Sequence, residues 1–160
     1  MDFLNTQRGL RPKVLEKYLK EVQLPTDKIN ELIQLVWEDA EFPDEQRAVW
    51  KRLLNKYTES HFIKEPIRVY RGGTNAQGFS WTTDLDMAKW FARRTLGFEQ
   101  VYWRERFGME YHMGTRVYSA LANPKSVVFT TNERLENEVV VKTWRKGCWI
   151  EDPIIVDTYK

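Results

Sequence analysis

The chain has 160 residues, the length of one ordinary domain, and its 42% apolar and 14% aromatic residues are typical of a globular protein rather than a disordered one. The formal net charge is only +2: residues 1–64 carry 11 basic and 11 acidic side chains, and residues 65–160 carry 14 and 12. Neither half therefore has the cationic excess that a nucleic-acid partner would favour.

The cysteine, histidine and apolar residues indicate the redox compartment, the absence of a metal site and the absence of a membrane span. The single cysteine, Cys148, excludes an internal disulfide and favours a reducing compartment. His61 and His112 stand at no metal-ligand spacing, so no metal site is expected. Because no apolar run approaches the roughly 18–20 residues that cross a bilayer, and no signal-peptide pattern begins the chain, we expect one cytoplasmic domain over 1–160 with no membrane partner.

Residues 1–64 have the apolar spacing of helices. A first helix begins near Pro12 and ends before Pro25, with an apolar stripe of Val14, Leu15, Tyr18, Leu19 and Val22. Thr26 is suited to cap a second helix, whose apolar face is Ile29, Leu32, Ile33, Val36 and Trp37. Residues 43–45 open a third, whose inward face is Val49, Trp50, Leu53, Leu54 and Tyr57. These patterns predict a helical lobe.

After Pro66 the apolar spacing shortens to two, which indicates strands. The first strand is expected to run from Ile67 to Arg71 and to be stopped by two glycines. Residues 79–83 then lead into a helix that Asp84 can cap, with a buried face of Leu85, Ala88, Phe91, Ala92 and Thr95. Further strands are predicted at 115–121, 126–130, 138–143 and 153–158. The fold class is therefore α+β, with a mixed or antiparallel β-core over residues 65–160.

Residues 97–113 combine aromatic and charged side chains. Their pattern fits a helix, a hairpin or an ordered loop. A rim of a cleft, a partner-recognition loop and a purely structural element are all open interpretations of this segment.

Three short motifs carry residues suited to binding and catalysis. Arg71 follows a buried strand and precedes Gly72, so a guanidinium that can bind phosphate or carboxylate lies beside accessible backbone. The alternative is a salt bridge followed by a turn. Residues 78–83 place Ser80, Trp81 and Thr82 before a helix, where hydroxyls can orient ribose hydroxyls or a carboxylate; the alternative is an ordinary hydroxyl-rich helix entry.

The third motif is Glu136-Asn137-Glu138, immediately before three valines. If the strand begins at the first glutamate, the two carboxylates project to the same side. Acids at the mouth of a buried strand are costly unless they are solvated or paired, which suggests a functional role. The alternative is a pair of edge-strand charges that prevent aggregation.

The order and spacing of these motifs resemble the mono-ADP-ribosyltransferases of the Arg–Ser–Glu class, which include clostridial-type toxins, vertebrate ecto-enzymes and several small phage enzymes. The family pattern is aromatic-Arg-Gly, then Ser-Thr-Ser leading to an Ala-x-x-Phe-Ala helix, then Glu-x-Glu entering a strand. The corresponding segments are Tyr70-Arg71-Gly72, Ser80-Trp81-Thr82 with Ala88-Lys89-Trp90-Phe91-Ala92, and Glu136-Asn137-Glu138. The resemblance covers roughly residues 66–142. Trp81 and Thr82 depart from the usual Thr and Ser, and the strand after Glu138 lacks a proline that many relatives have.

The resemblance implies an ADP-ribosyltransferase fold that uses NAD as cosubstrate, without a metal. Glu138 would stabilise an oxocarbenium-like ribose. Ser80 would orient Glu138 and contact the same ribose, and Trp81 and Thr82 would also bind NAD. Arg71 would hold the pyrophosphate, and the Gly72 backbone would bind the nicotinamide amide. Relatives with Glu at both ends of the triplet typically modify arginine.

Glu136 would therefore position an arginine of a target protein. A small phage or bacterial protein that acts on host machinery would suit this chemistry. Rival interpretations are an NAD glycohydrolase, an enzyme that ADP-ribosylates nucleic acid, and a binding module that keeps the fold without the activity. A nucleic-acid surface at Tyr102, Trp103, Arg104, Arg106 and Phe107 is a further alternative, disfavoured by the near-neutral charge.

Overall fold

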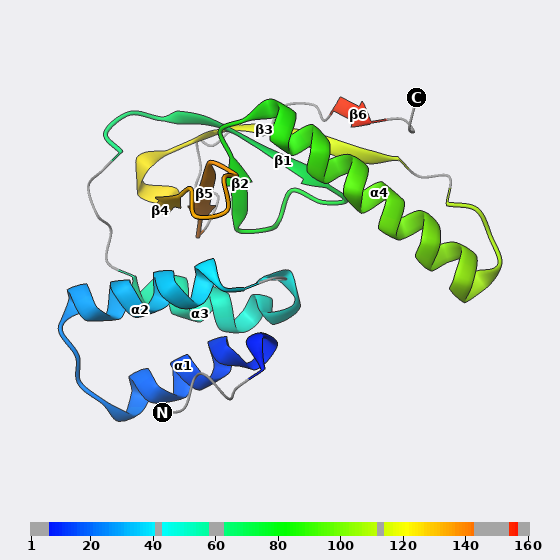
Figure 1. Ribbon diagram of the computed structural model, residues 1–160. Coiled ribbons are helices and arrows are strands. Elements are labelled where there is room, and N and C mark those ends of the chain that lie inside the picture. Colours follow the sequence, from blue (N-terminus) through cyan, green and yellow to red (C-terminus); the bar gives the residue numbers. More distant parts are fainter. Residues whose placement is uncertain (1–6, 41–42, 58–62, 112–113, 143–153, 157–160) are drawn as a thin grey trace.

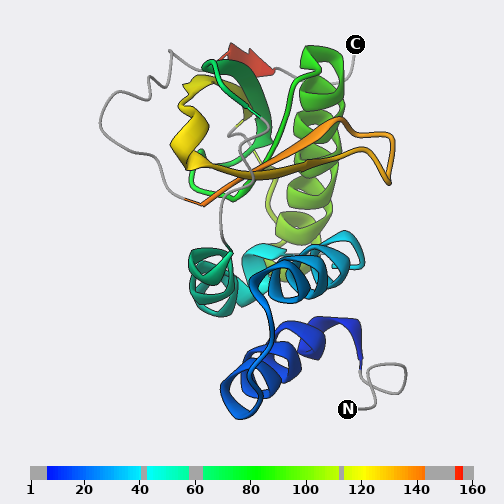
Figure 2. The same cartoon turned by 90° about the vertical axis from the view of Figure 1, so that its left-hand side faces the viewer.

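The protein has an α+β fold in which a lobe of three helices packs against an antiparallel sheet, and a long fourth helix lies along that sheet (Figure 1). The computed structural model describes residues 7–40, 43–57, 63–111, 114–142 and 154–156. The view turned by 90° in Figure 2 shows the same separation, with the three N-terminal helices beneath the sheet. The predicted order of a helical lobe followed by a β-rich part is confirmed.

The helical lobe contains α1 (Arg11–Glu21), α2 (Thr26–Glu38) and α3 (Arg47–Lys56). Two 3-10 turns accompany them, η1 (Arg8–Leu10) and η2 (Pro43–Gln46). All three predicted helices are therefore present. The predicted cap differs, because Thr26 is the first helical residue and Pro25 occupies the capping position without a side-chain hydrogen bond.

The apolar faces of these helices form one core with part of the sheet. Trp37 and Trp50 are fully buried, with ring centroids 4.8 Å apart in an edge-to-face arrangement. The same core includes side chains from the sheet region, namely Phe79, Val128, Phe129 and Val140. The lobe is thus joined to the sheet by a shared apolar core rather than by a linker alone.

The sheet has six strands in the order β4-β5-β2-β1-β3-β6, and every neighbouring pair is antiparallel. The strands are β1 (Ile67–Gly73), β2 (Ser80–Thr82), β3 (Thr115–Ala122), β4 (Val127–Thr131), β5 (Glu138–Val141) and β6 (Ile154–Val156). A third 3-10 turn, η3 (Pro124–Ser126), precedes β4. The expectation that β1 ends at Arg71 is wrong, because Gly72 and Gly73 continue the pairing opposite Val117 and Arg116 of β3.

Helix α4 (Leu85–Phe107) begins as predicted at Asp84, whose Oδ1 accepts hydrogen bonds from the amides of Asp86 and Met87. It packs tightly on β1: a Cβ at Gly72 would lie 1.8 Å from the carbonyl oxygen of Ala88, so only glycine permits this approach. Gly108, with φ 63°, ends the helix.

Most of residues 97–113, for which a helix, a hairpin and an ordered loop were all open, are helical. Residues 97–107 form the second half of α4, and residues 112–113 lie outside the described part of the chain. The buried positions of α4 are Ala88, Ala92 and Leu96, so its second half buries no side chain fully. Among the described residues, no helix combines the length and apolar character needed to span a membrane.

Candidate active site

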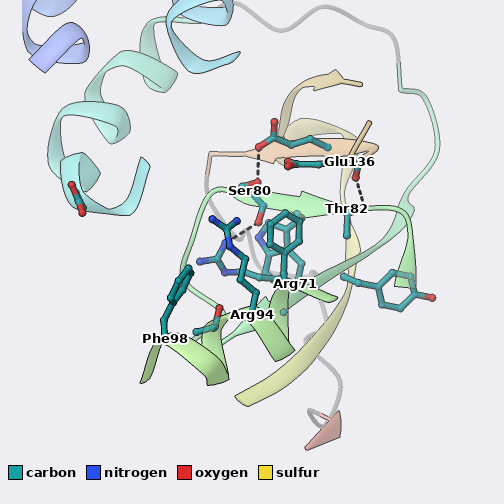
Figure 3. Close-up of a pocket in the computed structure, with 13 residues that line it drawn as sticks. Arg71, Ser80, Thr82, Arg94, Phe98 and Glu136 are labelled. Carbon is teal, nitrogen blue, oxygen red and sulfur yellow. Dashed lines mark hydrogen bonds between the residues drawn. The ribbon is translucent and has the colours of Figure 1, made fainter. Parts of the chain in front are cut away.

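A cleft of about 350 Å³ opens between the β2–β5 side of the sheet and the middle of α4 (Figure 3). Its volume falls within the roughly 300–1,000 Å³ typical of small-molecule sites. The cleft is lined by Glu45, Tyr70, Arg71, Gly72, Ser80, Trp81, Thr82, Phe91, Arg94, Thr95, Phe98, Glu136 and Glu138. All seven residues singled out from the sequence therefore border one cavity.

Strand register explains why Ser80 meets Glu138. Ser80 pairs with Val140 and Thr82 with Glu138, so Ser80 and Glu138 are diagonal neighbours on one face of the antiparallel pair. The Ser80 hydroxyl donates to Oε1 of Glu138 over 2.5 Å. Two side chains 58 residues apart are thereby joined at the cleft wall.

Glu138 is 3% exposed, and three donors surround its carboxylate. Oε1 accepts hydrogen bonds from the Ser80 hydroxyl and, over 3.1 Å, from Nε1 of Trp37 in α2. Oε2 accepts from Nη2 of Arg134 over 3.2 Å. A buried carboxylate is expensive unless it is paired and hydrogen-bonded, and these three donors supply the partners that Glu138 needs.

Glu136 lies in the turn before β5 rather than in the strand. The turn contains two non-glycine residues with positive φ, Leu135 at 56° and Asn137 at 47°. Both carboxylates line the cleft, but not for the predicted reason. The i, i+2 pattern of a strand does not apply, because β5 begins only at Glu138. The turn geometry brings the carboxylates together instead.

Burial raises the pKa of Glu136, and the nearby charge of Glu138 acts in the same direction. The guanidinium groups of Arg134 and Arg94 oppose this rise, but burial is the largest cause. Glu136 therefore takes up a proton more readily than an ordinary surface glutamate.

Arg134 bridges the two glutamates and was not predicted from the sequence. Its Nε lies 3.6 Å from Oε2 of Glu136, its Nη2 bonds Glu138, and its Nη1 donates to the carbonyl of Ala40 over 3.0 Å. The only sequence signal was an arginine four residues before a glutamate, a spacing that carries no fixed meaning outside a helix.

Arg71 is held by backbone carbonyl groups of the segment that follows β1. Its Nε donates to the carbonyl of Asn75 over 3.1 Å, and its Nη1 donates to that of Ser80 over 2.9 Å. The guanidinium lies against Gly78, where an added Cβ would be 2.2 Å from Cζ of Arg71. The positive charge of Arg71, on β1, is thus fixed at the cleft beside β2, the strand that carries Ser80.

Trp81 and Thr82 are bonded within the fold. Trp81 is buried in the core, and its Nε1 donates to the carbonyl of Gly78 over 3.0 Å. The Thr82 hydroxyl donates to the carbonyl of Glu136 over 2.6 Å and accepts from the amide of Asp84. Thr82 therefore ties the turn bearing Glu136 to β2; contact of either side chain with a ligand stays a prediction.

The opposite wall of the cleft comes from α4. Arg94 stacks between two rings, with its Cζ 5.5 Å from the centroid of Trp90 and 5.3 Å from that of Phe98. Figure 3 shows Arg94 and Phe98 on the helix side of the pocket, facing Ser80. Neither residue belonged to a motif recognised in the sequence, because their place in the cleft depends on α4 crossing the sheet.

The described residues contain no group of three or more His, Cys, Asp or Glu side chains that could hold a metal ion. Comparisons with protein-family models, with curated proteins and with solved structures find no match to this chain.

Proposed function

We propose that this chain is an NAD-dependent mono-ADP-ribosyltransferase of the corresponding fold, which transfers ADP-ribose to an arginine of a target protein and releases nicotinamide. One observation carries the proposal: Arg71, Ser80 and Glu138, from three strands separated in sequence, line the same cleft, with Ser80 hydrogen-bonded to Glu138. The motif resemblance around residues 66–142 independently favours the same chemistry.

The proposed first step breaks the bond between the ribose C1′ and the nicotinamide nitrogen. The bonding electrons leave with nicotinamide, which departs as a neutral ring, and positive charge develops on the ribose as in glycoside hydrolysis. A fixed, ionised carboxylate lowers the energy of that charge without reorganising. Glu138 fits this role because three donors hold its carboxylate in place at the cleft wall.

The proposed second step forms a bond between an acceptor nitrogen and C1′. A protonated guanidinium is a poor nucleophile, so it requires a group that positions it and takes its proton. Glu136 fits because burial raises its pKa, which makes it a better proton acceptor than an ordinary glutamate, and because it borders the same cleft. Arg71 supplies a positive charge suited to the pyrophosphate.

The proposal is tested by incubating the purified protein with adenylate-labelled NAD and a cell lysate, and locating the label by mass spectrometry. We expect a labelled protein modified at arginine, with nicotinamide released. Free ADP-ribose without labelled protein would indicate a glycohydrolase, and label sensitive to nuclease but not protease would indicate nucleic-acid modification. NAD binding without turnover would indicate a binding module, and neither binding nor turnover contradicts the proposal.

A further inference from the structure

The C-terminal end of α2 contacts the segment that carries both cleft glutamates at three points. Trp37 bonds Glu138, and the hydroxyl of Thr131 donates to Oε1 of Glu38 over 2.9 Å. The third contact is the bond from Arg134 to the carbonyl of Ala40. These pairs are 101, 93 and 94 residues apart, so the fold brings the end of α2 specifically to this segment.

The indole of Trp37 has little freedom to turn. It is fully buried, and Trp50, Phe79 and Phe129 contact it edge-on, with centroid distances of 4.8, 6.5 and 6.3 Å. Its only polar group is the Nε1–H donor, which points at Oε1 of Glu138. Because these rings fix the indole, its N–H group has a fixed direction toward the Glu138 carboxylate.

We propose that the C-terminal end of α2 supports the catalytic carboxylate, with Trp37 acting as a positioning residue that fixes Glu138. This inference rests on the proposed function. Trp37 and Ser80 both donate to Oε1, whereas Arg134 donates to Oε2, so donors from α2, β2 and the turn before β5 define the plane of the carboxylate. Without Trp37, Oε1 of Glu138 loses the donor that comes from the fully buried indole.

The bond from Trp37 can be removed without changing the charges around Glu138. The other charged groups at this end of the cleft are Arg134 and Glu136 from the turn, Arg71 from β1, Arg94 from α4 and Glu45 from η2. Replacing the Trp37 indole leaves those groups in place and removes one of the described donors to Oε1. The carboxylate then loses part of its fixed orientation while its charged neighbours stay the same.

The core offers a matched control for this test. Trp50 is also fully buried and lies edge-to-face against Trp37, but its Nε1 has no hydrogen-bond partner within the described residues. Trp37→Phe and Trp50→Phe each replace one indole in the same core cluster with a smaller phenyl ring. Only the first removes a hydrogen bond to Glu138.

The experiment measures kcat and KM for nicotinamide release from NAD by both variants and the unmodified protein, with circular-dichroism melting to verify folding. We expect Trp37→Phe to lower kcat roughly ten- to hundred-fold, the range for a hydrogen bond to a charged group, with little change in KM. Trp50→Phe should keep nearly all of kcat.

Equal kcat values for the two folded variants overturn the inference while leaving the proposed function intact. If Trp37→Phe does not fold, Thr131→Val takes its place, because it removes another contact between the end of α2 and this segment, at a half-buried site. An unchanged kcat in Thr131→Val then overturns the inference. If the unmodified protein releases no nicotinamide, the proposed function fails and this inference fails with it.

Discussion

The two walls of the cleft differ in how firmly their side chains are held. On the sheet side, Ser80 and Glu138 are joined to each other, and Glu138 is 3% exposed and surrounded by donors. On the helix side, Phe98 is 60% exposed and Arg94 is placed by stacking between rings. Transition-state charge is stabilised best by groups that need not reorganise, so the sheet wall suits catalysis and the helix wall suits contact with a variable ligand.

The difference arises from where α4 is anchored. Its first half packs so closely on β1 that Gly72 admits no side chain, whereas its second half buries no residue fully. Arg94 and Phe98 stand near the change from one half to the other. The cleft therefore lies where a rigidly packed helix becomes an exposed one. Its two walls should respond differently to substitution.

The largest expected effect is on the sheet wall. Glu138→Gln removes the charge that would stabilise the ribose, and loss of such a contact costs about 2.7–4 kcal/mol, or roughly a hundred- to a thousand-fold in rate. Nicotinamide release from labelled NAD measures the loss, with circular dichroism to verify the fold. Turnover as fast as that of the unmodified protein would show that Glu138 is not catalytic and that the contrast between walls has no chemical meaning.

Glu136→Gln should separate transfer from hydrolysis. If Glu136 takes the proton of the acceptor, its loss lowers transfer to protein roughly a hundred-fold and spares much of the NAD hydrolysis. Label on protein and free ADP-ribose are measured from the same reaction. Equal losses of both products would assign Glu136 to the first step instead.

The raised pKa of Glu136 adds a pH test of the same residue. Because burial raises this pKa, the carboxylate becomes protonated at a higher pH than an ordinary glutamate, and transfer should fall as the pH falls through that raised value. Glu136→Gln should therefore lose the pH dependence of the transfer-to-hydrolysis ratio. Stability depends on pH in the opposite direction, because ionising a group with a raised folded-state pKa costs stability as the pH rises through that value.

Arg71→Lys tests the junction between β1 and β2, and we expect a smaller effect. Lysine keeps the charge but not the fork that reaches the carbonyls of Asn75 and Ser80. Loss of such charge-assisted bonds weakens NAD binding roughly tenfold, measured by calorimetry. Gly78→Ala is the companion variant, because its methyl group would displace the Arg71 guanidinium without replacing it. If both variants bind NAD normally, Arg71 has only a structural role.

Local patterns predicted much of this architecture. The helical lobe follows from apolar periodicity, and the start of α4 follows from Asp84, because the cap is made by residues within one turn of each other. The prediction for strand β1 is too short, since glycines usually end strands. Here Gly72 and Gly73 stay paired with β3, and glycine is required at position 72 because α4 approaches the strand closely. Residues 97–107 were ambiguous because the second half of α4 buries too little to produce an apolar stripe.

The candidate site was predictable only in part. Motif order indicated Arg71, Ser80 and Glu138, and the structure brings all three to one cleft. The contact from Trp37 was not predictable, because an inward-facing tryptophan on a helix gives no sign of a carboxylate 101 residues away. The same holds for Arg94 and Phe98, whose roles depend on how α4 crosses the sheet. Local sequence indicates chemical capacity, whereas long-range packing decides which groups meet.

The smallest expected effect concerns the helix wall. Phe98→Ala removes a ring from the cleft, and aromatic contacts are worth about 0.5–1.5 kcal/mol, so KM for NAD should rise roughly two- to twelve-fold with kcat nearly unchanged. Phe107→Ala is the control: Phe107 is 52% exposed on the same helix but lies outside the cleft. Steady-state nicotinamide release gives both constants. If Phe98→Ala lowers kcat as strongly as Glu138→Gln, the helix wall takes part in the chemistry; if it matches Phe107→Ala, the ligand does not reach α4.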